Sequence, residues 1–172
     1  MKVKAAKKAL VSVVMGSDSD LPIMSEATKI LEEFGIAYEL ILTSAHRTPE
    51  RTTKFAKKVA SRGVKVIIVG AGAAAHLAGV IASQTLLPVI GVPIDATSLK
   101  GLDALLATVQ MPGGIPVATM AIGKPGAKNA ALFAVRFLAL SDKTIHKKLA
   151  GYVAKMAKDV EKKQENISCR KF

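Results

Sequence analysis

Residues Ala9–Asp20 read ALVSVVMGSDSD, and this stretch decides the fold. Its first seven residues are apolar or small and rich in Val, which is typical of a buried strand that ends at Gly16. The polar residues that follow lead directly into Pro22–Phe34, where apolar side chains recur at helical spacing until Gly35 ends the helix. The stretch therefore predicts a strand, a polar loop and a helix in immediate succession.

The same strand–helix unit is repeated along the chain. Short apolar runs predict further strands at Ile36–Thr43, Val64–Val69, Leu87–Ile94 and Pro116–Ile122. Helices are expected from Pro49, with Thr48 as N-cap, to Gly63, and over about Ala74–Thr85, Gly101–Gln110 and Gly126–Leu140. Such alternation predicts an α/β fold with a doubly wound parallel sheet and right-handed crossovers. Five strands favour the flavodoxin-like order 2-1-3-4-5 over a six-strand dinucleotide-binding fold.

One more helix follows these units. Ser141 is expected to cap a long, lysine-rich amphipathic helix that runs to about Gln164, and residues 165–172 are expected to be frayed. A length of 172 residues without an internal repeat or linker suits a single domain. We therefore expect a core over about residues 9–140 with a C-terminal helical arm over about 141–164.

Composition narrows the possible functions. Half of the residues are hydrophobic and only 4% are aromatic, so the core is expected to consist of Ala, Val, Ile and Leu, as in a parallel sheet covered on both faces. The net charge of +12 raises nucleic acid as a partner. Most lysines, however, fall at helical spacing in Met1–Lys8, Lys54–Lys65 and Lys143–Lys171, without interleaved aromatics to stack bases. Solvated helix faces that attract anionic metabolites fit this pattern better than a nucleic-acid surface.

Cysteine usage and hydropathy favour the cytoplasm. The single cysteine, Cys169, lies in a polar tail and indicates neither a disulfide framework nor a CxxC metal site. No uncharged apolar run reaches the length of about 18 residues that a membrane span needs. The basic N-terminus leads into a short apolar run that continues into SDSD, which predicts a strand and not a signal peptide.

Three polar or glycine-rich loops follow the first three predicted strands. They are MGSDSD (Met15–Asp20), SAHRTP (Ser44–Pro49) and GAGAAAHL (Gly70–Leu77). In a 2-1-3-4-5 sheet, ligands bind beyond the carboxyl ends of these strands. The three loops are therefore expected to converge on one site, which suits a small phosphorylated ligand.

The MGSDSD loop can bind an anion. Backbone N–H groups at a helix N-terminus and serine hydroxyls are suitable donors, and Asp20 can accept hydrogen bonds from ribose hydroxyls. Capping of the helix by Ser19 or Asp20 explains the same residues equally well. Asp18 and Asp20 also resemble a Mg²⁺ site of the receiver or haloacid-dehalogenase type. That interpretation is disfavoured because the third strand ends in Gly-Ala-Gly, without an acidic or polar side chain.

The SAHRTP loop places His46 beside Arg47. Histidine exchanges protons near neutral pH, and the arginine fork binds phosphate in a bidentate manner, so the pair suits an acid–base group next to an anion clamp. Taken alone, the two residues are explained as simply by an exposed loop histidine and a solvated arginine.

The third loop imitates a dinucleotide fingerprint. Gly70–Ala75 matches GxGxx(G/A), and Asp95 follows twenty residues after Ala75. The match follows the third strand instead of the first, and the chain leaves no room for a separate substrate domain. Small residues also let backbone N–H groups approach a ligand closely. His76 fits a structural role or a ligand contact, and His146 is expected on the surface.

Taken together, MGSDSD, SAHRTP, GAGAAAHLAG, LPVIGVPI and VQMPGGIPVATMAIGKPGAKNAAL closely resemble the class I N5-carboxyaminoimidazole ribonucleotide mutases of de novo purine (IMP) biosynthesis. The resemblance covers roughly Leu10 to Lys162, with the motifs in the same order. It departs at Ala73, where the family usually has Gly, and at Ala78, where it usually has Pro. If position 73 needs a positive φ, alanine strains this loop.

The resemblance implies an isomerase that moves a carboxylate from the exocyclic nitrogen to the ring carbon of an aminoimidazole ribonucleotide, without a metal or organic cofactor. His46 would protonate the nitrogen as CO₂ leaves and take the ring-carbon proton after CO₂ re-adds. The phosphate would be held by Ser17, Ser19 and Arg47, and the ribose by Asp20. The pocket for the base and the transient CO₂ would be lined by Ser44, Gly72, Ala74, Ala75, His76 and Leu77. Family members are homo-octamers, and the C-terminal helix resembles an arm that reaches a neighbour.

Alternatives stay open at this point. A sister group carboxylates aminoimidazole ribonucleotide with dissolved CO₂, but it tends to have Lys at the position of Arg47 and to lack the segment Ala74–Leu77. A non-catalytic nucleotide-binding or receiver-like module would keep the fold and leave His46 unused. NAD binding through Gly70–Ala75 is the third possibility.

Overall fold

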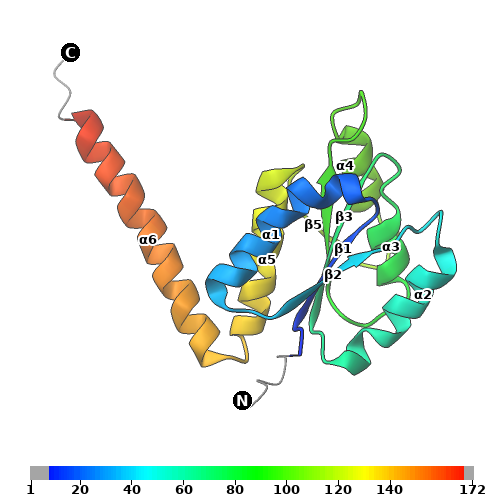
Figure 1. Cartoon of the computed structure of the whole chain (residues 1–172). Helices are drawn as coiled ribbons and strands as arrows, with labels where there is room; N and C mark the ends of the chain where they lie inside the picture. Colours follow the sequence, from blue (N-terminus) through cyan, green and yellow to red (C-terminus); the bar gives the residue numbers. More distant parts are fainter. Residues whose placement is uncertain (1–7, 169–172) are drawn as a thin grey trace, which may run out of the picture. The chain divides into compact units, whose positions relative to one another are not determined.

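The sheet has the predicted topology. The structure is a computed structural model that describes residues 8–168 (Figure 1). All strand pairs are parallel, and the order is β2-β1-β3-β4-β5, which confirms the doubly wound α/β fold of flavodoxin-like order. The strands are β1 (Val11–Met15), β2 (Tyr38–Leu42), β3 (Val66–Gly72), β4 (Val89–Ile94) and β5 (Ala118–Thr119).

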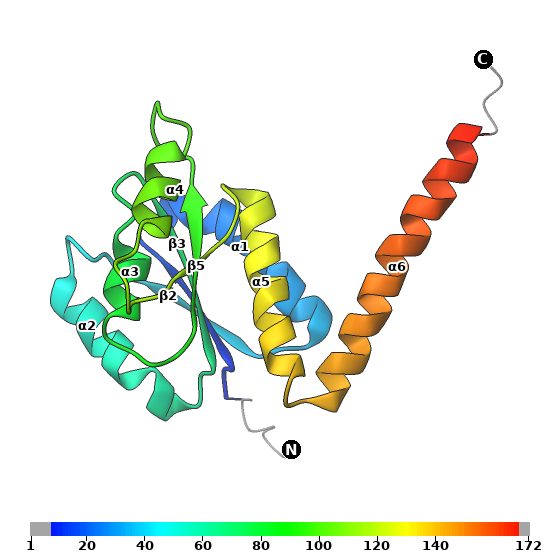
Figure 2. The same cartoon turned by 180° about the vertical axis from the view of Figure 1, so that it is seen from behind.

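Helices cover both faces of this sheet. The chain contains α1 (Leu21–Phe34), α2 (Pro49–Lys58), α3 (Leu77–Ala82), α4 (Leu102–Val109), α5 (Lys124–Ala139) and α6 (Lys143–Ser168), with short 3₁₀ helices η1 (Asp18–Asp20) and η2 (Ala60–Arg62). Helix α1 and the part of α5 up to Ala134 lie on one face, and α2, α3 and α4 lie on the other (Figures 1 and 2). Between residues 8 and 168, none of the helices combines the length and apolarity needed to cross a bilayer.

The core has the predicted composition. Strands β1, β3 and β4 occupy the middle of the sheet, and all their residues are buried except Gly72, which is partly exposed. Val and Ile dominate these strands because each has a helix layer on both sides. A buried cluster of Ala, Val, Ile and Leu side chains joins β3 to α2, α3 and α4. This layer fixes the carboxyl ends of the first three strands relative to one another.

The chain divides into two compact units. The first unit ends at Ala134 and contains the whole sheet, and the second begins at Val135 and contains the end of α5 and all of α6. The expected division into a core of residues 9–140 and an arm of residues 141–164 stays a prediction.

The end of β3 differs from the prediction. Gly70, Ala71 and Gly72 continue the strand and pair with Val92, Pro93 and Ile94 of β4, although they were expected in a loop. A Cβ on Gly70 would overlap the Met24 sulfur, so glycine is needed there for α1 to pack on the sheet. Because these glycines are part of a strand and do not open a helix, the dinucleotide fingerprint is not formed.

Other boundaries also shift. Strand β5 has only two residues, because it is an edge strand whose ladder to β4 consists of the Ile90–Ala118 and Gly91–Thr119 pairs. Helix α3 begins at Leu77 and not at Ala74, because the N–H groups of Ala75 and His76 donate two residues back, to the carbonyls of Ala73 and Ala74, in tight turns instead of helical bonds.

The C-terminal helix is capped by a different residue from the one expected. Asp142 Oδ1 accepts hydrogen bonds from the N–H groups of Thr144 (2.8 Å) and Ile145 (3.0 Å), whereas the Ser141 hydroxyl donates back to the Leu138 carbonyl. Ser141 therefore belongs to the turn that ends α5. The helix also continues beyond Gln164 to Ser168, and a Gln164–Ser168 side-chain hydrogen bond of 3.0 Å supports its last turn. Residues 169–172 of the expected frayed tail, with Cys169, lie outside the described residues.

Candidate active site

The loops after β1, β2 and β3 enclose one cavity, as their positions in the sequence predict. Its volume is about 330 Å³. The expected site residues that line it are Ser17, Ser19, Asp20, Ser44, His46, Arg47, Gly72, Ala74 and Leu77. Two expected residues are not in its wall: Ala75, which is buried in the core, and His76, which contacts His46 instead.

The first loop is held by Asp20. Ser17 is the N-cap of η1, and its N–H donates to Asp20 Oδ2 at 3.0 Å in a capping box. The Asp20 side chain is therefore both a cap, as one interpretation expected, and part of the cavity wall. Its burial raises the pKa of the carboxyl above the usual range, although backbone hydrogen bonds from Ser17 and Gly16 oppose this rise.

His46 and His76 form a pair at the mouth of the cavity. His46 Nε2 and His76 Nδ1 are 2.9 Å apart, and the two rings meet edge to face with centroids 5.0 Å apart. One of these nitrogens must carry a proton and the other a lone pair for the hydrogen bond to form. Both side chains are exposed, so a ligand in the cavity can reach the His46 ring. The contact with His76 therefore restricts the orientation of the His46 ring and links the tautomers of the two rings.

Arg47 links two of the loops. Its Nη2 donates to the Gly16 carbonyl at 3.1 Å, and its backbone N–H donates to the Ser44 hydroxyl at 3.2 Å. Among residues 8–168 it forms no ion pair, so most of its five N–H donors stay available for an anion. This geometry suits the anion clamp that the sequence predicts.

Three threonines fix the His46–Arg47 loop, and the sequence did not single them out for this role. The buried hydroxyls of Thr43 and Thr52 are 2.8 Å apart, and Thr52 also donates to the Ser44 carbonyl at 3.2 Å. The Thr48 hydroxyl accepts a hydrogen bond from the Ser44 N–H at 2.9 Å. Thr48 was expected to cap α2, but its side chain makes no hydrogen bond to an N–H group of that helix. These hydroxyls join the start of α2 to the end of β2 and hold the loop between them.

The third loop supplies a wall of small residues. A Cβ on Gly72 would lie 2.5 Å from the Cβ of Ala96, so glycine is required for these two strand ends to meet. Ala73 has a φ of 53°, which confirms that this position strains an alanine. Ala78 is the second residue of α3, where alanine and the proline expected from the resemblance are equally compatible with the helix, because the N–H at this position needs no intrahelical acceptor.

The cavity wall also contains small residues outside the expected set of site residues, namely Gly16, Ala45, Ala71, Ala73 and Ala96. Ala96 follows β4, which pairs with β3, so the parallel order itself is the signal that could have found it. The others are neighbours of expected residues in the same loops. Their lack of side chains leaves the backbone accessible to a ligand.

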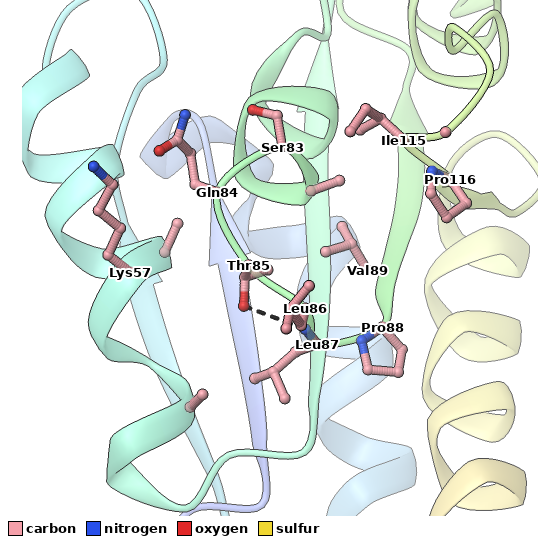
Figure 3. Close-up of a pocket in the computed structure, with 14 residues that line it drawn as sticks. Lys57, Ser83, Gln84, Thr85, Leu86, Leu87, Pro88, Val89, Ile115 and Pro116 are labelled. Atoms are coloured by element: carbon pink, nitrogen blue, oxygen red, sulfur yellow. Dashed lines mark hydrogen bonds between the residues drawn. The ribbon is translucent and has the colours of Figure 1, made fainter.

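A larger cavity of about 920 Å³ lies at the opposite edge of the sheet, near the amino ends of β4 and β5 (Figure 3). Its wall is mainly apolar and includes Leu86, Leu87, Pro88 and Ile115. Lys57 is the one titratable side chain among the described residues that line it. Acid–base chemistry therefore has no basis there, and the smaller cavity is the candidate active site.

Comparisons with known proteins identify the family of this chain. Residues 10–159 match the family model described as AIR carboxylase. The N5-carboxyaminoimidazole ribonucleotide mutase of Pyrococcus horikoshii is 57% identical over 94% of this chain and 90% of its own length. The mutase of Thermotoga maritima is 52% identical over 91% of each chain. The phosphoribosylaminoimidazole carboxylase of Saccharomyces cerevisiae is 46% identical over 97% of this chain but only 29% of its own length.

A solved structure shows the same fold. The crystal structure of Treponema denticola PurE has a TM-score of 0.84 and 30% identity, and the match covers 92% of this chain and 98% of that chain. The resemblance inferred from the loop motifs is thereby confirmed. Since the family model spans most of the sequence and full-length relatives share half or more of their residues with it, this chain belongs to the AIR carboxylase family.

Proposed function

We propose that this chain is an N5-carboxyaminoimidazole ribonucleotide mutase, which forms 4-carboxy-5-aminoimidazole ribonucleotide in purine biosynthesis. The observation that carries the proposal is the paired His46, which adjoins a cavity walled by Arg47, Asp20 and small residues. Its relatives of similar length, such as those of P. horikoshii and T. maritima, bear this name. Acid–base chemistry next to an anion clamp is what the reaction requires.

The proposed reaction has two halves that share His46. In the first, the bond between the exocyclic nitrogen and the carboxylate breaks, its electron pair stays on nitrogen, and His46 delivers a proton there as CO₂ forms. In the second, the ring carbon attacks CO₂ and a carbon–carbon bond forms. The proton on that ring carbon then returns to His46. Protons and electrons balance, and the histidine ends in its starting state.

The remaining walls bind and enclose the substrate. We assign the phosphate to Ser17, Ser19 and Arg47, and a ribose hydroxyl to the buried carboxylate of Asp20. The base and the CO₂ face Ser44, Gly72, Ala74 and Leu77, with Ala75 and His76 outside this wall. Walls of small residues suit a transient CO₂, because a close-fitting cavity retains it until the ring carbon reacts.

A mutase is favoured over a carboxylase that uses dissolved CO₂. Arg47 and the segment Ala74–Leu77 follow the mutase pattern, and both contribute to the cavity wall. The S. cerevisiae relative named as a carboxylase is a much longer chain, of which this sequence spans 29%.

Turnover without additives tests the proposal. The purified chain is given N5-carboxyaminoimidazole ribonucleotide with no added metal and no bicarbonate, and the P. horikoshii relative is run beside it. We expect the 4-carboxy product from both proteins. Product from the relative and none from this chain would contradict the proposed function.

We also propose that the chain assembles with copies of itself, as an octamer, in the cytoplasm. Exposed apolar side chains form stripes on two helices, with Leu102, Leu106 and Val109 on α4 and Phe133 and Phe137 on α5. Residues spaced by three or four positions share one helix face, so each set is a continuous apolar strip. Closed symmetry is the common way to bury such strips.

A further inference from the structure

A second recess adjoins the candidate active site. This outer recess has a volume of about 410 Å³ and lies where β2 ends and α2 begins. Its wall includes Ser17, Ser44, Arg47, Thr48 and Arg51. Gly16, Ser17, Ser44 and Arg47 also line the active-site cavity. Arg47 is therefore common to both spaces, and Arg51 borders the outer recess alone.

The outer recess brings together two guanidinium groups. Arg51 is exposed, and its side chain forms no hydrogen bond or ion pair with any residue between 8 and 168. Arg47 uses one of its side-chain donors on the Gly16 carbonyl. Two cations that face one recess repel each other unless an anion lies between them. The free donors and the positive charge both point to an anionic ligand.

The start of α2 adds to this preference. Arg51 is the third residue of α2, at the helix end where a cation is unfavourable and an anion is favoured. The N–H groups of the first turn have no intrahelical acceptor. The hydroxyls of Ser17, Ser44 and Thr48 supply further polar groups in the wall. A phosphate in the recess would reverse the unfavourable placement of the Arg51 charge.

One acidic side chain, Asp18, also borders the recess. Its Oδ1 accepts hydrogen bonds from the Ser17 hydroxyl at 3.2 Å and from the Ser19 N–H at 3.1 Å. It is thus engaged with its own loop. With two arginines against one aspartate, the wall keeps a net positive charge.

We propose that Arg51 is a second phosphate-binding guanidinium, which reaches from the outer recess the 5′-phosphate that Ser17, Ser19 and Arg47 hold. This inference rests on the proposed function and adds a residue to it. The ribose and base then lie in the inner cavity with Asp20 and His46, and the phosphate lies on the solvent side of Arg47. A planar fork suits this role, because arginine binds phosphate through two parallel hydrogen bonds.

Binding measurements on matched variants test the role of Arg51. Arg51→Gln and Lys54→Gln each remove one positive charge from α2, but Lys54 does not line the outer recess. The ligands are aminoimidazole ribonucleotide and its dephosphorylated nucleoside, measured by calorimetry. We expect Arg51→Gln to weaken nucleotide binding about ten-fold and nucleoside binding less than two-fold. Lys54→Gln should leave both within about two-fold, and Arg51→Lys should restore only part of the loss.

Two results would overturn the inference: nucleotide binding that Arg51→Gln leaves within two-fold, or an equal loss for nucleotide and nucleoside. Inorganic phosphate, titrated into the wild type and Arg51→Gln and followed by ³¹P NMR, separates this inference from the proposed function. If turnover is absent and Arg51→Gln still weakens phosphate binding, the result supports Arg51 as a phosphate-binding residue and contradicts the mutase assignment. If turnover is present and Arg51→Gln changes neither phosphate nor nucleotide binding, the result supports the mutase assignment and contradicts the role of Arg51.

Discussion

At the scale of single residues, the His46–His76 contact orients the ring of the candidate acid–base group. His46 Nε2 and His76 Nδ1 are 2.9 Å apart, so the hydrogen bond between them needs a proton on one nitrogen and a lone pair on the other. His46 can therefore exchange a proton with a ligand while His76 holds its ring orientation. Asp20 differs, because it is buried and its carboxyl has a raised pKa.

His46→Asn should abolish most of the activity and leave the fold intact, because the side chain is exposed. A positioned acid–base group accelerates a reaction by about 10²–10⁴. Turnover should fall by that factor, which corresponds to about 3–5 kcal/mol of barrier. Steady-state kinetics at saturating substrate measure the fall, and circular dichroism checks the fold. More than a tenth of wild-type activity would exclude His46 as the proton carrier.

Ala73→Gly should stabilise the protein. A positive φ costs an alanine about 1–2 kcal/mol, and glycine removes this cost at the expense of about 0.5–1 kcal/mol of added freedom in the unfolded chain. We expect a net gain of about 0.5–1 kcal/mol in the free energy of unfolding, measured in urea. Ala74→Gly is the matched control, since Ala74 is exposed and is not among the positive-φ residues. It should destabilise, and a loss of stability in both variants would show that the strain at Ala73 is absent.

At the scale of elements, the sheet positions the loops and the threonine hydroxyls hold one of them in shape. Thr52 is completely buried and its hydroxyl contacts Thr43, Thr48 and Ser44. Helix α2 begins only at Pro49, and these bonds tie the His46–Arg47 loop to its first turns. The conformation of His46 and Arg47 thus depends on groups that do not touch a ligand.

Thr52→Val should therefore affect activity and stability together. The loss of a buried hydroxyl that leaves partners unsatisfied costs about 1–2 kcal/mol of stability, and the loosened loop should raise KM and lower kcat. Thr52→Ser keeps the hydroxyl and should restore both constants. Thr108→Val is the control, because Thr108 is buried and donates only to Ala104 within its own helix. Unchanged kinetics in Thr52→Val, measured by steady-state assay, would remove Thr52 from the positioning of the loop.

Sequence periodicity was sufficient for the fold and for most of the candidate site. Strands with buried Val and Ile and loops with MGSDSD and SAHRTP are local patterns, and parallel order alone brings their ends together. What local pattern could not predict depends on distant partners. Gly70–Gly72 became a strand because β4 lies beside it, and Ala96 joined the wall because β4 pairs with β3. Asp142 and not Ser141 caps α6, because the Ser141 hydroxyl donates to the Leu138 carbonyl at the end of α5.

At the scale of the whole molecule, the apolar strips on α4 and α5 predict a large homo-oligomer. Static light scattering at micromolar concentration should give about eight times the subunit mass of 18.0 kDa. Replacement of Leu106 by Glu should lower that mass, because a charge in a buried contact opposes association. A mass of one or two subunits for the unmodified chain would contradict the octamer.

The fate of the carboxylate tests the central claim most directly. N5-carboxyaminoimidazole ribonucleotide labelled with ¹³C in its carboxylate is converted in buffer that contains unlabelled bicarbonate, and mass spectrometry follows the label into the product. The account predicts that most of the label is retained, because the small-walled cavity keeps CO₂ between the two half-reactions. Near-complete loss of the label, or turnover that requires added bicarbonate, would contradict the account and make this chain a carboxylase.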